Sequence, residues 1–179
     1  MSCSAAVGMG VGLRARDLPG FHHASHQRVI LRELPQVAYF KIEVPGTAAK
    51  LRALIAAAGA AIAGPFDGEE AITLLADLEA GATGTMPSAL LPDLIAPVLE
   101  HFRAGRRAEA TQAYARILPL INYENRQCGL RATKAVMAAG GVIASEAVRH
   151  PLEPLQTEAR AGLMQLAKAL DPVAMRWGK

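Results

Sequence analysis

One short stretch decides the fold: Val37-Ala38-Tyr39-Phe40-Lys41-Ile42-Glu43. Its β-branched and aromatic residues predict a strand, and Pro45-Gly46 then predicts a turn that ends this strand. Residues 47–58 are rich in alanine and leucine, which predicts a helix closed by Gly59. A strand followed by a helix in this order is the start of a β/α unit.

Two more strand-like runs follow at similar intervals. Residues 60–66 form the first run, and Asp67 then predicts an N-cap, with Glu69 and Glu70 in the first turn of a helix that ends near Glu79. The second run is at residues 81–86. Strand and helix therefore alternate three times, which indicates a parallel sheet, and the apolar strands predict burial on both faces.

After Pro87 the pattern is helical throughout. Apolar residues recur at helical spacing over residues 90–102, 107–121, 131–139 and 158–170. We therefore expect three parts: a poorly ordered segment at 1–26, a β/α part at 27–104 that opens with a short helix, and a helical region at 105–179. The chain has 179 residues, whereas a closed (β/α)8 barrel normally needs about 250.

The composition argues against two classes of partner. The net charge is +3, the 19 basic residues are scattered and only 4% of residues are aromatic, so we expect no nucleic-acid partner. The longest uncharged stretch, residues 53–66, is shorter than the roughly 18 residues of a membrane span, so we expect no membrane partner.

Cysteine and histidine usage indicates a reduced, cytoplasmic protein without a metal. Cys3 and Cys128 are the two cysteines, and we favour a bystander role for Cys128 over a reactive thiol. His22, His23 and His26 could share one helix face and bind a metal, but no further ligand lies beside them. We favour solvated histidines and expect no metal site.

Lys41 is the residue that points to chemistry. Burying an ammonium group is costly, so a lysine inside an apolar strand is expected to favour its uncharged form, which attacks carbonyl groups and forms Schiff bases. In a regular strand Tyr39, Lys41 and Glu43 share one face, so Glu43 could set the charge of Lys41 or transfer protons. The alternative is that Lys41 lies near the end of the strand and reaches solvent.

Glycine-rich segments follow Lys41 in the two later runs. They are Gly64-Pro65-Phe66-Asp67-Gly68 and Gly81-Ala82-Thr83-Gly84-Thr85-Met86. Loops after the strands of β/α folds build ligand sites, and glycines let backbone groups approach a ligand closely.

With these motifs the chain resembles the C-terminal portion of the dihydrodipicolinate synthase / N-acetylneuraminate lyase family, from about Leu31 to Lys179. The motifs that carry the resemblance are residues 39–43, 64–68, 80–86 and 131–134. Residues 124–127 and 141–151 look especially similar to the branch that contains 2-keto-3-deoxy-L-arabonate dehydratases.

The resemblance implies an α/β fold, here a partial (β/α)8 barrel of the last three β/α units followed by a C-terminal helical bundle. It implies Schiff-base chemistry, in which Lys41 condenses with pyruvate or a related 2-keto acid and no cofactor takes part. It also implies that Gly64, as the glycine after its strand, and Met86 line the substrate pocket, and that the protein is a homo-oligomer, usually a tetramer.

This sequence also departs from the family pattern. The first five strands, with their carboxylate-binding threonine loop and proton-relay tyrosine, have no counterpart here, and Tyr39 does not match that tyrosine. Two hypotheses stay open. One is a lyase or dehydratase acting on a 2-keto acid through Lys41. The other is a truncated, inactive family fragment or association subunit, whose uncovered strand edges favour association.

Overall fold

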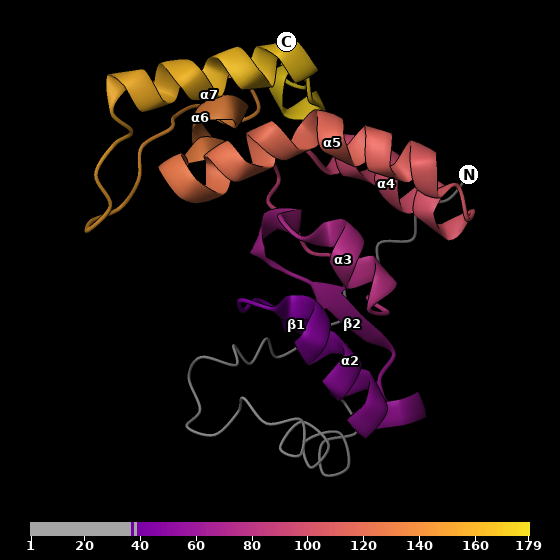
Figure 1. Ribbon diagram of the computed structural model, residues 1–179. Helices are drawn as coiled ribbons and strands as arrows, with labels where there is room; N and C mark the ends of the chain where they lie inside the picture. The colour runs from indigo at the N-terminus through magenta and orange to yellow at the C-terminus, as the bar shows by residue number, and fades with distance from the viewer. Residues whose placement is uncertain (1–36, 38) are drawn as a thin grey trace. The chain divides into compact units, whose positions relative to one another are not determined.

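The computed structural model describes residue 37 and residues 39–179, and the chain divides into two compact units (Figure 1). Within the described residues, the first unit comprises residues up to 67 and 76–84, and the second comprises residues 68–75 and 85–179. The predictions of a poorly ordered segment at 1–26, a short helix before the first strand and a histidine cluster lie outside the described residues.

A three-stranded sheet organises the first unit. Its strands are β1 (Tyr39–Ile42), β2 (Gly64–Asp67) and β3 (Gly84–Thr85), in the order β1-β2-β3. β1 and β2 run parallel, with Tyr39 opposite Gly64 and Ile42 opposite Asp67. The connection between them is α2 (Thr47–Ala58), followed by the single turn η1 (Gly59–Ala61). The predicted β/α alternation is therefore confirmed.

Helix α2 begins and ends as its sequence predicts. The Thr47 hydroxyl donates a hydrogen bond of 2.6 Å to the carbonyl of Val44 at the turn before the helix. Gly59 ends the helix with a φ of 53°, and its N–H binds the carbonyl of Ile55; glycine adopts this left-handed region most readily. Leu51 and Leu54 are buried on a helix that packs against β1 and β2.

Burial on both faces is confirmed only in part. In β2, Gly64, Pro65 and Asp67 are buried. In β1, however, Phe40 and Ile42 are buried, whereas Tyr39 is 62% exposed and Lys41 is also exposed. The prediction is wrong for β1 because its sequence alternates, so that one face is apolar and the other carries lysine and tyrosine.

The segment after β2 also differs from the prediction. Asp67 is not an N-cap but the buried last residue of β2. Glu69, Glu70 and Ala71 form the turn η2 (Glu69–Ala71) with φ values of 48°, 56° and 69°. The helix α3 begins only at Leu74 and ends at Glu79. This left-handed turn belongs to the second unit, and hydrogen bonds from other residues of that unit, described below, hold it.

The second unit is helical, as predicted. Its elements are α4 (Pro92–Arg103), α5 (Arg107–Tyr123), the π-helical turn η3 (Glu124–Cys128), α6 (Arg131–Ala139), α7 (Thr157–Leu170) and η4 (Val173–Met175). α4 lies along α5, and α6 and α7 pack together (Figure 1). The core of the unit consists of fully buried aliphatic side chains, including Val98, Ile117, Leu120, Val136 and Leu163.

Two contacts hold η4 (Val173–Met175), near the C-terminus, against the rest of this unit. The Asp93 carboxylate, in the first turn of α4, accepts a hydrogen bond of 3.0 Å from the N–H of Val173. Gly140 lies so close to the segment that a Cβ there would be 1.9 Å from the carbonyl oxygen of Ala174. Close backbone approach therefore requires glycine at this position.

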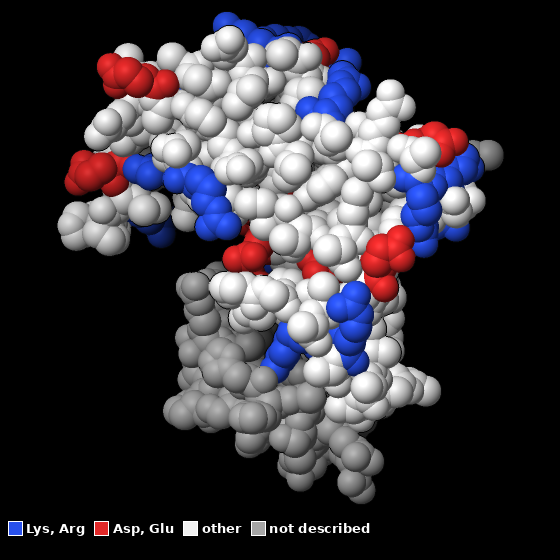
Figure 2. Space-filling model, in the orientation of Figure 1, with Lys and Arg blue, Asp and Glu red and all other residues white. Residues whose placement is uncertain are grey.

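The surface carries mixed charge. On the face shown in Figure 2, acidic and basic side chains occur at several separate places. Within the described part of the chain, no helix combines the length and apolarity that crossing a membrane requires.

Candidate functional site

Lys41 and Glu43 lie together on the exposed face of β1. The Lys41 Nζ is 3.3 Å from the Glu43 Oε2, and their side chains are 31% and 48% exposed. Tyr39 lies on the same face, where its ring stacks on that of Phe66 with a centroid separation of 5.9 Å. The predicted grouping of these side chains is therefore present, in the arrangement in which Lys41 reaches solvent.

The Lys41–Glu43 ion pair contributes little to the free energy of folding. An exposed ion pair of this kind contributes about 0–1 kcal/mol to folding, so the pairing itself does little to hold β1 in place. The amine is open enough to meet a small carbonyl compound, and Glu43 places a carboxylate beside it. What the first unit offers chemically is thus an accessible primary amine beside an acid.

Gly64 does not occupy the position that the resemblance implied. It is the first residue of β2 and not a residue after it, and it pairs with Tyr39 and not with Lys41. A Cβ at Gly64 would lie 2.6 Å from the ring of Tyr39, so the ring packing itself requires glycine. The glycine that directly follows β2 is Gly68.

Met86 directly follows β3 and is 47% exposed. It belongs to the second unit, whereas Lys41, Glu43 and Gly64 belong to the first. The structure thus brings Lys41 and Glu43 together and assigns Met86 to a separate unit.

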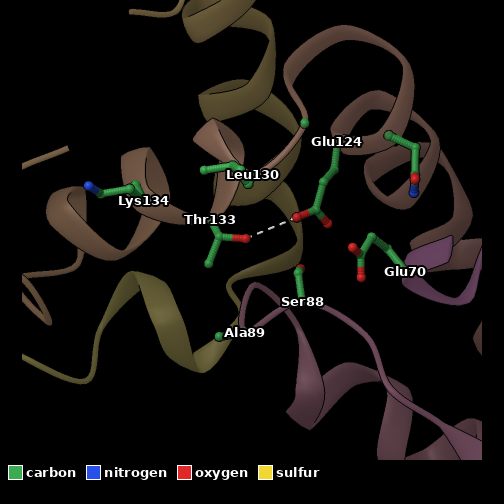
Figure 3. Close-up of a pocket in the computed structure, with 9 residues that line it drawn as sticks. Glu70, Ser88, Ala89, Glu124, Leu130, Thr133 and Lys134 are labelled. Atoms are coloured by element: carbon green, nitrogen blue, oxygen red, sulfur yellow. Dashed lines mark hydrogen bonds between the residues drawn. The ribbon is translucent and has the colours of Figure 1, made fainter. Parts of the chain in front are cut away.

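A pocket of about 340 Å³ lies within the second unit (Figure 3). Residues from the turn η2, the segment before α4, η3 and the start of α6 line it: Glu70, Ser88, Ala89, Glu124, Asn125, Gly129, Leu130, Thr133 and Lys134. By volume it is suited to a small ligand, since ligand pockets occupy about 300–1,000 Å³.

Glu124 is the buried acid of this pocket, only 2% exposed. The Thr133 hydroxyl donates a hydrogen bond of 3.0 Å to its Oε1, and Ser88 forms a second side-chain hydrogen bond with the carboxylate. Burial raises the pKa of Glu124 and the nearby Glu70 raises it further, while the two hydrogen bonds oppose this rise. Buried acids with perturbed pKa values are typical of binding and catalytic sites.

Local backbone structure positions both pocket acids. Glu124 opens the π-helical turn η3, and such turns occur frequently at functional sites. Glu70 lies in the left-handed turn η2, which Tyr114 and Asn125 hold from α5 and η3. The Tyr114 hydroxyl is within 2.9 Å and 2.6 Å of the carbonyl oxygens of Ala71 and Ile72, and the Asn125 amide donates 3.3 Å to that of Glu69.

Sequence reasoning missed this pocket, although one signal was present. Ile117, Leu120 and Ile121 form the buried face of α5, and Glu124 continues that face at helical spacing. A glutamate at an inward position of an apolar stripe is costly unless it is paired, so it marks a candidate site. The left-handed turn at Glu70 carries no comparable sequence signal.

Comparisons with known proteins agree on one family. The sequence model described as the dihydrodipicolinate synthetase family matches residues 27–170. An L-2-keto-3-deoxyarabonate dehydratase of Azospirillum brasilense is 58% identical over 146 residues, which cover 82% of this chain and 47% of that protein.

Solved structures give the same result for the fold. A putative dihydrodipicolinate synthetase from Pseudomonas aeruginosa matches with a TM-score of 0.72 and 27% identity, over 83% of this chain and 50% of that one. An N-acetylneuraminate lyase from Proteus mirabilis matches with a TM-score of 0.67 and 20% identity, over 81% of this chain and 50% of that one. The chain therefore spans about half the length of these relatives.

Proposed function

This chain belongs to the dihydrodipicolinate synthetase family, and on that premise we propose that it is the lysine-bearing part of a Schiff-base dehydratase acting on a 2-keto-3-deoxy sugar acid. The observation that carries the proposal is the 58% identity to an L-2-keto-3-deoxyarabonate dehydratase, of which this chain spans 47%. The substrate and the Schiff-base mechanism are parts of the proposal.

Lys41 would be the catalytic residue. Its neutral Nζ adds to the C2 carbonyl of the keto acid, and water leaves to give an iminium. A proton is then lost from C3, and the resulting enamine expels the hydroxyl group at C4, which leaves with a proton as water. Hydrolysis of the iminium frees the lysine, so no external oxidant or reductant is consumed.

Glu43 supports this proposal as a neighbour of the amine. At 3.3 Å from Nζ it lies within reach for proton exchange with the lysine, directly or through one water molecule. Gly64 and Met86 remain proposed substrate-binding residues on the resemblance alone.

The architecture is part of the same proposal. The three strands of the sheet and their helices would be three β/α units of a (β/α)8 barrel, and the helical region would be its C-terminal bundle. A small 2-keto acid as substrate, a cytoplasmic location and a homo-oligomer complete the proposal.

Borohydride trapping tests the role of Lys41. The purified chain is incubated with pyruvate, reduced, and measured as an intact mass, with Lys41→Ala and Lys50→Ala as paired variants. Lys50 is the matched control because it lies in α2 of the same unit, and burial lowers its pKa. We expect a reduced pyruvyl adduct on the unchanged chain and on Lys50→Ala, and none on Lys41→Ala.

Two outcomes would overturn the proposal. An adduct that survives in Lys41→Ala would assign the chemistry to another amine. Absence of an adduct on a chain that circular dichroism shows to be folded would favour the inactive fragment or association subunit.

A further inference from the structure

We propose that Glu124 is a positioning residue, which holds the segment after β3 through Ser88 and so fixes the place of Met86 within the second unit. The inference rests on the proposed function, because Met86 is a substrate-binding residue only within that function. Glu124 would then act on substrate binding without touching the substrate.

The Ser88 hydroxyl links Glu124 to the segment after β3. Ser88 Oγ accepts a hydrogen bond of 3.3 Å from the N–H of Leu90, so its own proton is donated to the Glu124 carboxylate, with which it forms a side-chain hydrogen bond. As expected of a donated bond, the Ser88 contact opposes the rise in the pKa of Glu124 that burial causes. In Figure 3 the Ser88 side chain points toward Glu124.

Glu124 is itself fixed and can therefore serve as an anchor. Its side chain is 2% exposed, and the Thr133 hydroxyl, from α6, donates a hydrogen bond of 3.0 Å to its Oε1. In the preceding turn of α5, the side chains of Leu120 and Ile121 are fully buried. The carboxylate thus accepts hydrogen bonds from two hydroxyl groups and ties the segment before α4 to α6.

The link from Ser88 to Met86 is short and stiff. Pro87 stands between them, and its ring locks its own φ and restricts Met86 to extended backbone conformations. On the other side of Ser88, Leu90 and Leu91 are buried at 0% and 1% exposure. Because Met86 itself is 47% exposed, its place depends on how the backbone beside it is held.

The methyl resonance of Met86, observed in a chain labelled at the methionine methyl groups, tests the proposal. Glutamine offers one acceptor oxygen where the carboxylate offers two, so we expect Glu124→Gln to disturb the bond to Ser88 and to move the Met86 resonance. Glu146→Gln is the matched control, because Glu146 lies in the same unit but pairs with Arg160 at the surface, and it is expected to cause no shift. An unmoved Met86 resonance in Glu124→Gln would overturn the proposal.

A double substitution shows whether the effect passes through Ser88. In a Ser88→Ala background, we expect Glu124→Gln to cause no further shift of the Met86 resonance, whereas in a Ser88→Thr background, which keeps the hydroxyl, the shift should persist. Ser145→Ala is the control background, since Ser145 Oγ also accepts a hydrogen bond from the N–H two residues later, that of Ala147. Equal responses to Glu124→Gln with and without the Ser88 hydroxyl would overturn the proposed route.

Pyruvate titration of the trapped adduct separates positioning from general destabilisation. We expect Glu124→Gln to raise the pyruvate concentration that gives half-maximal adduct by about two- to tenfold, as the loss of one hydrogen bond does. The yield at saturating pyruvate should stay unchanged, because Lys41 is intact. A lower yield at saturation with an unchanged half-saturation would overturn the positioning role.

Two provisions keep the outcomes separable. If Glu124→Gln does not fold, Ser88→Ala takes its place in the titration, with the rise absent from Ser145→Ala and reversed in Ser88→Thr; a rise that Ser88→Thr does not reverse would overturn the proposal. Failure of the unchanged chain to form any adduct counts against the proposed function. The Met86 resonance needs no adduct, so its failure to move counts against the positioning role alone.

Discussion

Removing the Tyr114 hydroxyl tests whether α5 holds the left-handed turn of the pocket. Tyr114 is 8% exposed, and its hydroxyl lies 2.9 Å from the carbonyl oxygen of Ala71 and 2.6 Å from that of Ile72. Tyr114→Phe keeps the ring and leaves both carbonyls without this donor. A buried polar group that loses its partner costs about 1–3 kcal/mol, so we expect a loss of unfolding free energy in that range.

Urea unfolding, followed by circular dichroism, measures this loss. Tyr123→Phe is the matched control, because Tyr123 ends the same helix and its hydroxyl lies beside Gly162 and not at the turn. We expect this control to change the unfolding free energy by less than about 0.5 kcal/mol, because it keeps the tyrosine ring and takes no donor from the turn. In a thermal scan each lost kcal/mol corresponds to about 2–4 °C for a chain of this length.

The reasoning fails if the two variants lose equal stability. It also fails if Tyr114→Phe loses stability but the amide resonances of Glu69 and Glu70 stay where they are. In that case the hydroxyl would stabilise the core in general without holding the turn, and the pocket would not depend on Tyr114.

Three further measurements probe other features of the second unit. Gly140→Ala is expected to cost at least about 1–3 kcal/mol by overpacking, since its Cβ would meet the carbonyl of Ala174; a fully stable variant in urea unfolding would contradict the close approach. Glu124→Gln is expected to flatten the pH dependence of stability. Burial raises the pKa of Glu124, so between the unfolded and the folded pKa the folded chain keeps a proton that the unfolded chain has released. The unfolding free energy therefore falls as the pH rises through this range. Equal slopes of unfolding free energy against pH in the unchanged chain and in Glu124→Gln would contradict this. In a Cys3→Ser background, Cys128 is expected to react with a thiol reagent only as fast as the chain opens. Its side chain is 1% exposed, and burial raises the pKa of its thiol. Rapid labelling of Cys128 in the folded chain would refute this prediction.

The repeating elements were predictable because their signals are local. The helix over residues 47–58 and the helix over residues 131–139 have the predicted bounds, since alanine-rich runs closed by glycine define both ends. The parallel pairing of β1 and β2 followed from a helix-length connection between two short strands. These features depend on spacing alone.

The turn after β2 could not be predicted, because its conformation depends on distant residues. Asp67, Glu69 and Glu70 read locally as the start of a helix, yet Tyr114 and Asn125, more than 40 positions away, hold the turn in the left-handed region. The pocket shares this dependence. Glu124 was visible as an inward acid, but its partners Ser88 and Thr133 come from segments on either side of α5.

The exposed face of β1 presents the Lys41 amine, but a working catalytic site also requires groups that hold the substrate against that amine. Parallel sheets in β/α proteins are normally covered on both faces, whereas Tyr39 is 62% exposed and Lys41 and Glu43 share its face. An open lysine reacts with a keto acid only weakly unless surrounding groups hold the substrate against it. Oligomer mass and adduct yield therefore have to be measured on the same sample. An adduct that appears only in an assembled state would mean that association, and not β1 alone, makes Lys41 a catalytic residue.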